Sequence, residues 1–377
     1  MNDASNKRNL AADIFRGLGL WILFIDHLEP NFWSHFTPGQ FGFSDFAEIF
    51  VFFSGYINAR MNERAFAWGG PLAALRKLSG RIFRLYAAHI VTMAASIAIL
   101  AFFAARGIRI TDNTLYLWIQ NPPEYAVRTL ALFYAPHWYS LLPIYIVLAP
   151  FTILVINSLR RWPRLTLTVS FLVWCVAQFP FTDLAVMTRQ EAWFFRPIAW
   201  QWMMVLGAAS AMYSDRIKLA VQSKWLRLAA SAIVVGSALL KIASLARIHL
   251  IQGSALVVRL VAHDSGKARL APFRLIHFLC LAILVAAIPW DQNKLRKSRL
   301  LTMAAVLGRN SLPIYCVTLI LTIFGNLYLE NSPSGPLLQL ACCAAGLAIM
   351  TAIGFFASRT PYNRNSLEKD QRRSGIH

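Results

Sequence analysis

Long apolar runs separated by short polar stretches dominate this chain. Most are long enough to cross the roughly 30 Å hydrocarbon core of a bilayer as a helix. The fifth run is short and the ninth is long. The runs cover residues 13–33, 43–60, 82–105, 137–157, 165–181, 195–213, 226–246, 273–290, 301–329 and 337–358. This pattern predicts an all-α polytopic integral membrane protein with about ten transmembrane helices.

The distribution of basic residues orients the predicted bundle. Ten spans place both termini on the same side of the membrane. Of the 37 Lys and Arg residues, 24 lie on that side and 10 lie in the opposite loops. Cytoplasmic loops are enriched in Lys and Arg, so both termini are expected to be cytoplasmic. The domain prediction is a cytoplasmic tail over 1–12, a transmembrane domain over 13–358 and a second cytoplasmic tail over 359–377.

Composition narrows the class of protein. With 57% hydrophobic and 14% charged residues, the chain is typical of a polytopic membrane protein. The net charge of +20 comes from short basic bursts between apolar runs, which favours the lipid bilayer over nucleic acid as partner. The five cysteines lie inside apolar runs, and HExxH, paired CxxC and P-loop patterns are all missing from the sequence. No metal is therefore expected.

The first apolar run carries an Arg and a His. Arg16 and His27 are eleven residues apart, which is three helical turns, so both side chains leave one face about 16 Å apart along the axis. Ionisable groups inside a membrane are by default candidates for a functional site. The alternative is that Arg16 snorkels to the headgroups and His27 caps the outer end of the helix.

Two carboxylates follow in the second run. Asp45 and Glu48 share a helix face and are expected at the height of His27, because the first two helices are antiparallel about a short loop. One carboxylate would then hold the tautomer of His27 while the imidazole accepts a proton from a hydroxyl. The alternative is a buried polar network that only fixes helix packing.

Two further features are candidates for binding a donor. Ser54 and Gly55 are small enough to let a ligand approach the backbone closely, although small residues also pack plain helix pairs. Arg81 and Arg84, three residues apart in the densest basic stretch, could bind phosphates through charge-assisted hydrogen bonds. Anionic lipid headgroups would suit these arginines equally well.

A second polar set is expected to line the same cavity. Each member alone is more often structural, but several cations at different depths would help an anionic group dwell in the membrane. The candidates for substrate binding are His137, Trp138, Tyr139, Arg196, Arg274 and His277.

Several of these motifs together resemble a known family. The Arg16-x10-His27 spacing, FFSGY at 52–56 and RIFRLY at 81–86 resemble the acyltransferase-3 family of membrane acyltransferases. Within it, three longer segments look like the OpgC branch, which succinylates osmoregulated periplasmic glucans. They are SDFAEIFVFFSGY (44–56), HWYSLLPIYIVLAP (137–150) and GKARLAPFRLIHFLCLA (266–282). The likeness covers residues 8 to about 325.

The resemblance implies a ten-helix O-acyltransferase of the bacterial inner membrane. Such an enzyme takes an acyl group from cytoplasmic acyl-CoA, here succinyl-CoA, and delivers it to a hydroxyl of a periplasmic glucan or other carbohydrate. Arg16 and His27 would be the essential pair, and Arg81 and Arg84 would face the CoA phosphates. The chain departs from the wider family in having no Pro soon after Arg84. The rival interpretations are a membrane carrier for an anionic solute, which would more often show paired halves with discontinuous helices, and a structural membrane subunit.

Overall fold

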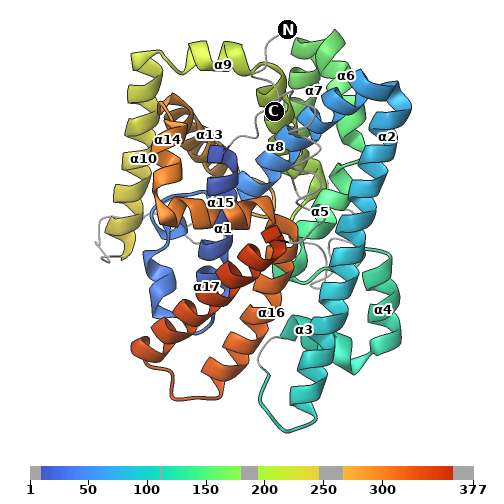
Figure 1. Ribbon diagram of the computed structural model, residues 1–377, viewed down its shortest axis with the longest axis vertical. Helices are drawn as coiled ribbons and strands as arrows, with labels where there is room; N and C mark the ends of the chain where they lie inside the picture. The colour runs from blue at the N-terminus through green and yellow to red at the C-terminus, as the bar shows by residue number, and fades with distance from the viewer. Residues whose placement is uncertain (1–9, 111–112, 180–193, 246–265, 360–377) are drawn as a thin grey trace. The chain divides into compact units, whose positions relative to one another are not determined.

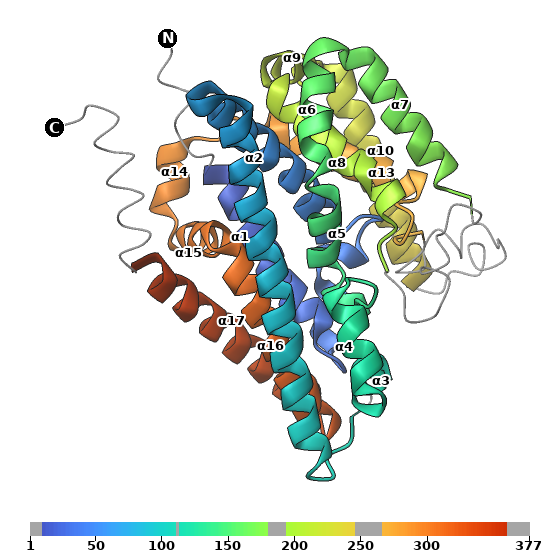
Figure 2. The ribbon, with the colours of Figure 1, turned by 90° about the vertical axis from the view of Figure 1, so that its right-hand side faces the viewer.

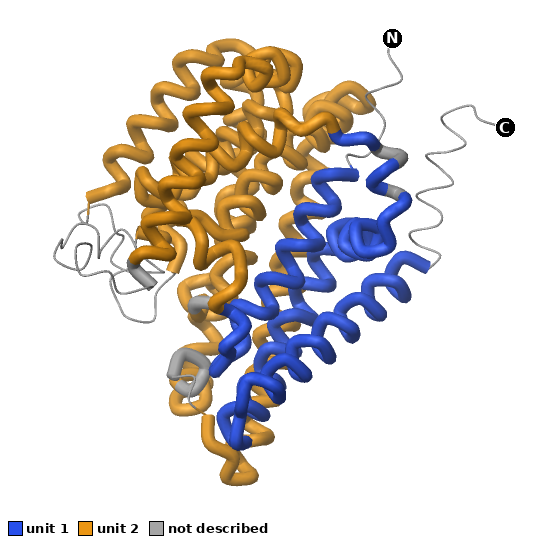
Figure 3. Tube along the Cα trace, turned by 90° about the vertical axis from the view of Figure 1, so that its left-hand side faces the viewer, with its two compact units in different colours: residues 1–34, 290–377 blue, residues 35–289 orange. Residues whose placement is uncertain are grey.

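The computed structural model describes residues 10–110, 113–179, 194–245 and 266–359. The predicted tails are thus described only in part, and most of the outer loop at 247–272 lies outside the described residues. The chain divides into two compact units, coloured separately in Figure 3. Unit 1 comprises residues 1–34 and 290–377, and unit 2 comprises residues 35–289. Every long element in the described part of the chain is a helix, as the apolar periodicity predicts.

Unit 1 is built on the crossing of its first helix with a helix from the far end of the chain. A Cβ at Gly17 would lie 1.8 Å from the Ala304 carbonyl oxygen, and one at Gly308 would lie 1.8 Å from the Asp13 carbonyl oxygen. Only glycine allows this approach, which is how small residues pack helices in membranes. The helices of unit 1 are α1 (Leu10–His27), α14 (Gln292–Lys297), α15 (Arg299–Arg309), α16 (Ser311–Glu330) and α17 (Pro336–Arg359).

Unit 2 begins with a very long helix, α2 (Phe46–Ala104). Gly69 and Gly70 interrupt it with non-helical dihedrals, and Gly70 has a φ of 67°, in the region that favours glycine. The helix therefore has two arms, and its direction changes between them (Figure 1). The sequence predicts two spans joined by a basic loop with a turn at these glycines. The turn is there, but helix extends through the basic residues on both sides of it.

Further helices surround α2 in unit 2. They are α3 (Asn113–Gln120), α4 (Pro122–Leu130), α5 (Leu141–Leu148), α6 (Phe151–Arg161), α7 (Pro163–Val176), α8 (Pro197–Met212), α9 (Ser214–Ala220), α10 (Lys224–Leu245) and α13 (Pro272–Ala287). Short 3-10 helices precede α2, at Phe32–Phe36 and Pro38–Gln40, and α5, at His137–Tyr139. The helices α2 and α8 form the most extensive of these contacts.

Two glycines set the contact between α2 and α8. A Cβ at Gly55 would lie 2.0 Å from the Met204 carbonyl oxygen, and one at Gly207 would lie 2.0 Å from the Phe52 carbonyl oxygen. Each helix thus contributes one glycine against the backbone of the other. This geometry supports the helix-packing alternative for Gly55, while a role in binding a donor stays a prediction.

Two predicted spans are broken in the structure. The run at 137–157 contains α5 and α6, which are both labelled in Figure 2. The two helices are bent by 53° at the break between Leu148 and Phe151. The run at 301–329 is divided between α15 and α16 at Asn310, whose side-chain amide donates to the Val306 carbonyl at 3.0 Å. Proline lacks a backbone N–H, and the Asn side chain bonds to a backbone carbonyl of the preceding turn; a hydropathy average detects neither feature.

The structure contains fewer full-length candidate spans than the sequence predicts. Among the described residues, four helices are long and apolar enough to cross a membrane, namely α2, α10, α16 and α17, or five if α5 and α6 form one bent span. The helices α7 and α13 are apolar but shorter. The all-α membrane class is therefore supported, whereas the count of ten transmembrane helices stays a prediction.

Replacing Gly207 with Ala tests the close contact between α2 and α8. The added methyl must push against the Phe52 carbonyl, so we expect a loss of about 1–3 kcal/mol in the free energy of unfolding. Thermal unfolding in detergent would measure it as a lower Tm. Gly236→Ala in α10 is the control, because no atom lies within 4 Å of its added Cβ. Equal Tm values for the two variants would contradict the packing argument.

Candidate functional site

The N-terminus of α2 carries a capping box built from two acidic residues. The Asp45 carboxylate accepts from the backbone N–H of Ala47 at 2.8 Å, and the Glu48 carboxylate accepts from the backbone N–H of Asp45 at 2.9 Å. Reciprocal bonds of this kind satisfy N–H groups that the first turn of a helix leaves without partners. They also fix both side chains in one orientation.

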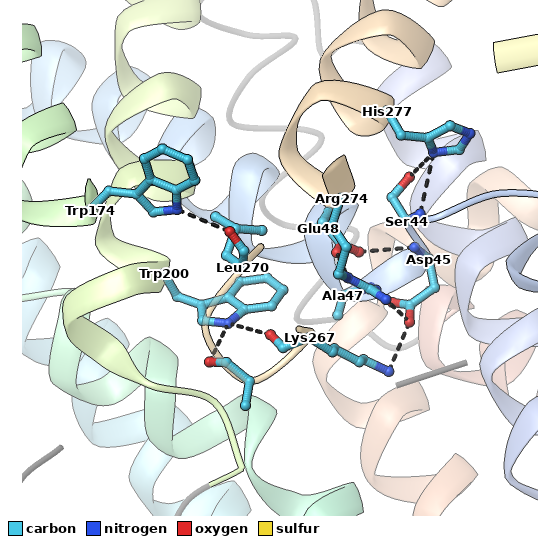
Figure 4. Close-up of polar contacts among 11 residues, drawn as sticks. Ser44, Asp45, Ala47, Glu48, Trp174, Trp200, Lys267, Leu270, Arg274 and His277 are labelled. Atoms are coloured by element: carbon cyan, nitrogen blue, oxygen red, sulfur yellow. Dashed lines mark hydrogen bonds and ion pairs between the residues drawn. The ribbon is translucent and has the colours of Figure 1, made fainter. Parts of the chain in front are cut away.

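The same carboxylates bind a buried arginine from α13. The Nε of Arg274 donates to Glu48 Oε1 at 2.8 Å, and its Nη2 donates to Asp45 Oδ2 at 3.0 Å (Figure 4). Glu48 is fully buried and the Arg274 side chain is 3% exposed. The stability of a buried ion pair depends on good hydrogen-bond geometry, because removing two charges from water is costly.

Lys267 completes the cluster from the loop before α13. Its Nζ lies 2.8 Å from Asp45 Oδ2, and both side chains are 13% exposed. Two cations therefore face two carboxylates, and their formal charges cancel. We call Asp45, Glu48, Lys267 and Arg274 the ion cluster.

Two tryptophans hold the loop that carries Lys267. The indole N–H of Trp200 on α8 donates to the Lys267 carbonyl at 3.1 Å, and that of Trp174 on α7 donates to the Leu270 carbonyl at 3.0 Å (Figure 4). The backbone N–H of Arg196 donates to the Ala268 carbonyl at 2.9 Å. Bonds from outside the loop thus fix the backbone from which Lys267 projects.

A histidine lies one turn beyond Arg274 on α13. His277 Nδ1 accepts from the backbone N–H of Ser44 at 3.2 Å and lies 2.7 Å from the Ser44 hydroxyl. A ring nitrogen that accepts carries a lone pair, so the neutral ring has its proton on Nε2. A Cβ at Gly42 would lie 2.3 Å from the His277 ring, so that glycine makes room for the imidazole. Ser44 and Asp45, the two residues before α2, are therefore both bound to α13, through His277 and Arg274.

The sequence predicts that Asp45 or Glu48 orients His27, but the structure gives both carboxylates other partners. Asp45 and Glu48 bind Arg274, Lys267 and backbone of their own helix turn, all within unit 2. This supports the alternative of a polar network that fixes helix packing. His27 belongs to unit 1, so its orientation by either carboxylate stays a prediction.

Unit 1 holds the Arg16–His27 pair on α1. Arg16 forms an ion pair with Asp13, whose side chain is buried. The Oδ2 of Asp13 also lies 3.7 Å from the Nε of Arg309. At the other end of the helix, the side chain of Asn326 donates to the His27 carbonyl at 3.2 Å and accepts from the Glu29 N–H at 2.9 Å. Both ends of α1 are thus held by polar contacts.

A comparison with family models identifies the protein at the level of its family. The OpgC protein family model matches residues 8–361. The chain belongs to the OpgC family. This confirms the resemblance of the three long motifs, and membership implies an acyltransferase role. No curated protein and no solved structure matches the chain significantly. Membership of the wider acyltransferase-3 family stays a prediction.

The ion cluster lies in two of the motifs that resemble OpgC. Asp45 and Glu48 belong to the segment 44–56, and Lys267 and Arg274 belong to the segment 266–282. Sequence reasoning named Asp45, Glu48, Arg274 and His277 but gave no role to Lys267, Ser44, Asp13 or Asn326. Their charge could have indicated Asp13 and Lys267. A buried acid such as Asp13 needs a cation, and Lys267 is a cation that a buried acid can pair with.

The remaining predicted site residues of this OpgC family member lie apart from the cluster along the chain. Ser54 is buried in α2. Arg81 is half-buried, whereas Arg84 is exposed and its Nε donates to the Gly80 carbonyl at 3.2 Å. Their roles in donor binding stay predictions.

The predicted substrate-binding residues differ in burial. Tyr139 is buried and its hydroxyl donates to Ser96 at 2.6 Å. Trp138 and Arg196 are half-buried, and the side chain of His137 lies outside the described part. Within the residues described, no group of three His, Cys, Asp or Glu could hold a metal ion.

The ion cluster should stabilise the fold strongly. Arg274→Met leaves the buried Glu48 carboxylate without its cation, and we expect a loss of about 3–5 kcal/mol in the free energy of unfolding. Lys267→Met should cost less, because Asp45 keeps Arg274 and is partly exposed. Thermal unfolding in detergent would rank the variants.

A matched control is Lys218→Met, which breaks an exposed pair with Asp215 and should leave Tm unchanged. Adding Glu48→Gln to Arg274→Met removes both charges and should recover part of the lost stability. An Arg274→Met variant as stable as the native protein would contradict a stabilising role for the cluster.

Proposed function

We propose that this protein is a succinyltransferase of the inner membrane. It transfers the succinyl group of cytoplasmic succinyl-CoA to hydroxyls of a periplasmic glucan or related carbohydrate. The observation that carries the proposal is the match of the OpgC family model over residues 8–361. The candidate membrane spans support the location. The proposed architecture is that of the acyltransferase-3 family, with ten transmembrane helices and both termini cytoplasmic.

The proposed reaction is a direct acyl transfer. His27 takes the proton of the attacking sugar hydroxyl, and the hydroxyl oxygen forms an ester bond with the succinyl carbonyl. The thioester bond breaks, and the leaving CoA thiolate takes up a proton as His27 gives one up. Arg16 is the second essential residue of α1. Its ion pair with Asp13 supports a fixed position for this side chain. A positioned base of this kind contributes about 10²–10⁴-fold to the rate.

Donor binding is assigned to α2. Arg81 and Arg84 hold the CoA phosphates through guanidinium bonds, and Ser54 and Gly55 border the path of the acyl-carrying arm. The exposure of Arg84 supports its access to a cytoplasmic ligand. His137, Trp138, Tyr139 and His277 are assigned to the carbohydrate.

The succinyl group carries a free carboxylate, which needs a cation in a dry site. Arg196 and Arg274 are the sequence candidates. We propose that one of these two cations binds the succinyl carboxylate; Arg274 lies in α13, and Arg196 is the N-cap residue of α8.

Reconstituted liposomes test the function. With labelled succinyl-CoA inside and glucan outside, the native protein should place label on the glucan, and His27→Ala should lower the rate by about 10²–10⁴-fold. His35→Ala, at an exposed histidine, is the matched control. Intact labelled succinyl-CoA outside, with no labelled glucan, would favour a carrier. A folded His27→Ala variant with its transfer rate intact would refute the assignment of the base.

Donor binding has a separate test. Replacing Arg81 and Arg84 together with Gln should weaken binding of succinyl-CoA, and the native affinity should fall as salt rises, because the contacts are ionic. The control replaces Arg160 and Arg161 with Gln, which removes the same charge from the end of α6. Equal affinities for succinyl-CoA in the two double variants would contradict the assignment.

A further inference from the structure

One buried histidine has no role in the site described so far. His89 lies in the second arm of α2 and is 1% exposed. Within the part of the chain that the structure describes, neither of its ring nitrogens has a hydrogen-bond partner. A buried polar group is normally hydrogen-bonded, and an ionisable residue in a membrane helix is by default a candidate for a functional site.

His89 belongs to a polar face that begins at the basic stretch. At 100° per residue, Arg81, Thr92 and Ser96 all lie within about 80° of His89 around the helix axis. Arg81 is half-buried, and the other three side chains are buried. The rise of 1.5 Å per residue separates Arg81 from His89 by about 12 Å along the axis.

The far end of this face is already hydrogen-bonded. The Ser96 hydroxyl donates to the Thr92 carbonyl at 2.8 Å and accepts from the Tyr139 hydroxyl at 2.6 Å. Ser96 therefore has its partners within the protein. His89, between this pair and Arg81, is the position on the face whose two ring nitrogens have no hydrogen-bond partner among the described residues.

We propose that His89 binds the pantetheine arm of the acyl-CoA donor. This inference rests on the proposed function, in which Arg81 and Arg84 hold the phosphates of the same molecule. The arm leaves the phosphates as a thin chain that carries amide groups. A neutral imidazole donates from one nitrogen and accepts at the other, which matches the C=O and N–H of an amide. His89 is thus a binding residue for the part of the donor that enters the apolar region.

Two probes separate His89 from the phosphate site. CoA contains both the phosphates and the pantetheine arm, whereas adenosine 3′,5′-bisphosphate contains phosphates without the arm. In purified protein, His89→Leu should weaken CoA binding by about tenfold, the effect of losing a typical hydrogen bond to a buried group. Binding of the bisphosphate should not change. His89→Gln keeps a donor and an acceptor and should retain most of the CoA affinity.

The controls separate failure of this inference from failure of the proposed function. Val91→Leu changes an exposed side chain two residues away and should bind both probes normally. If His89→Leu does not fold, His89→Met supplies the same test. Unchanged CoA affinity, or equal loss of both probes, would overturn the role of His89 while leaving the proposed function intact. If the native protein bound neither probe, the donor assignment itself would fall, and the role of His89 with it.

Discussion

Burial of the Glu48–Arg274 pair is the constraint on which unit 2 depends. Glu48 is inaccessible to water and belongs to the first turn of α2, while Arg274 comes from a helix 226 residues further along the chain. Neither charge is tolerable in that position without the other. The pair therefore fixes α2 against α13. The capping box and the loop that carries Lys267 depend on the same carboxylates, because they supply further hydrogen bonds and an ion pair to Asp45 and Glu48.

Glycine plays a parallel role in the helix contacts of both units. Gly17 and Gly308 in unit 1, and Gly55 and Gly207 in unit 2, form reciprocal contacts in which each helix places a glycine against a carbonyl of the other. Within a bilayer, apolar side chains gain little by leaving lipid, so close backbone approach and dispersion provide much of the association. Single glycines scattered in a sequence do not reveal such pairs, because the partner is distant in the chain.

The sequence predicts the class of the fold and most of the charged members of the site. Apolar periodicity locates α10 and α17 well, since they are uninterrupted and carry few charges. It fails at Pro150 and Asn310, where a helix ends and the next one begins inside an apolar run. Asp45 and Glu48 stand out as acids in an apolar segment. The partners of these two acids do not stand out in the sequence. Arg274 and Lys267 lie far along the chain, and the spacing of residues within one helix does not reveal such a contact.

The equal numbers of acids and bases in the ion cluster have an electrical consequence. A single elementary charge carried across the membrane exchanges about 2.3 kcal/mol with the field for every 100 mV. Because the formal charges of Asp45, Glu48, Lys267 and Arg274 cancel, the membrane voltage does almost no net work on the cluster if it moves as one body. A change in membrane voltage therefore gives the cluster no net push across the bilayer as long as its four members stay together.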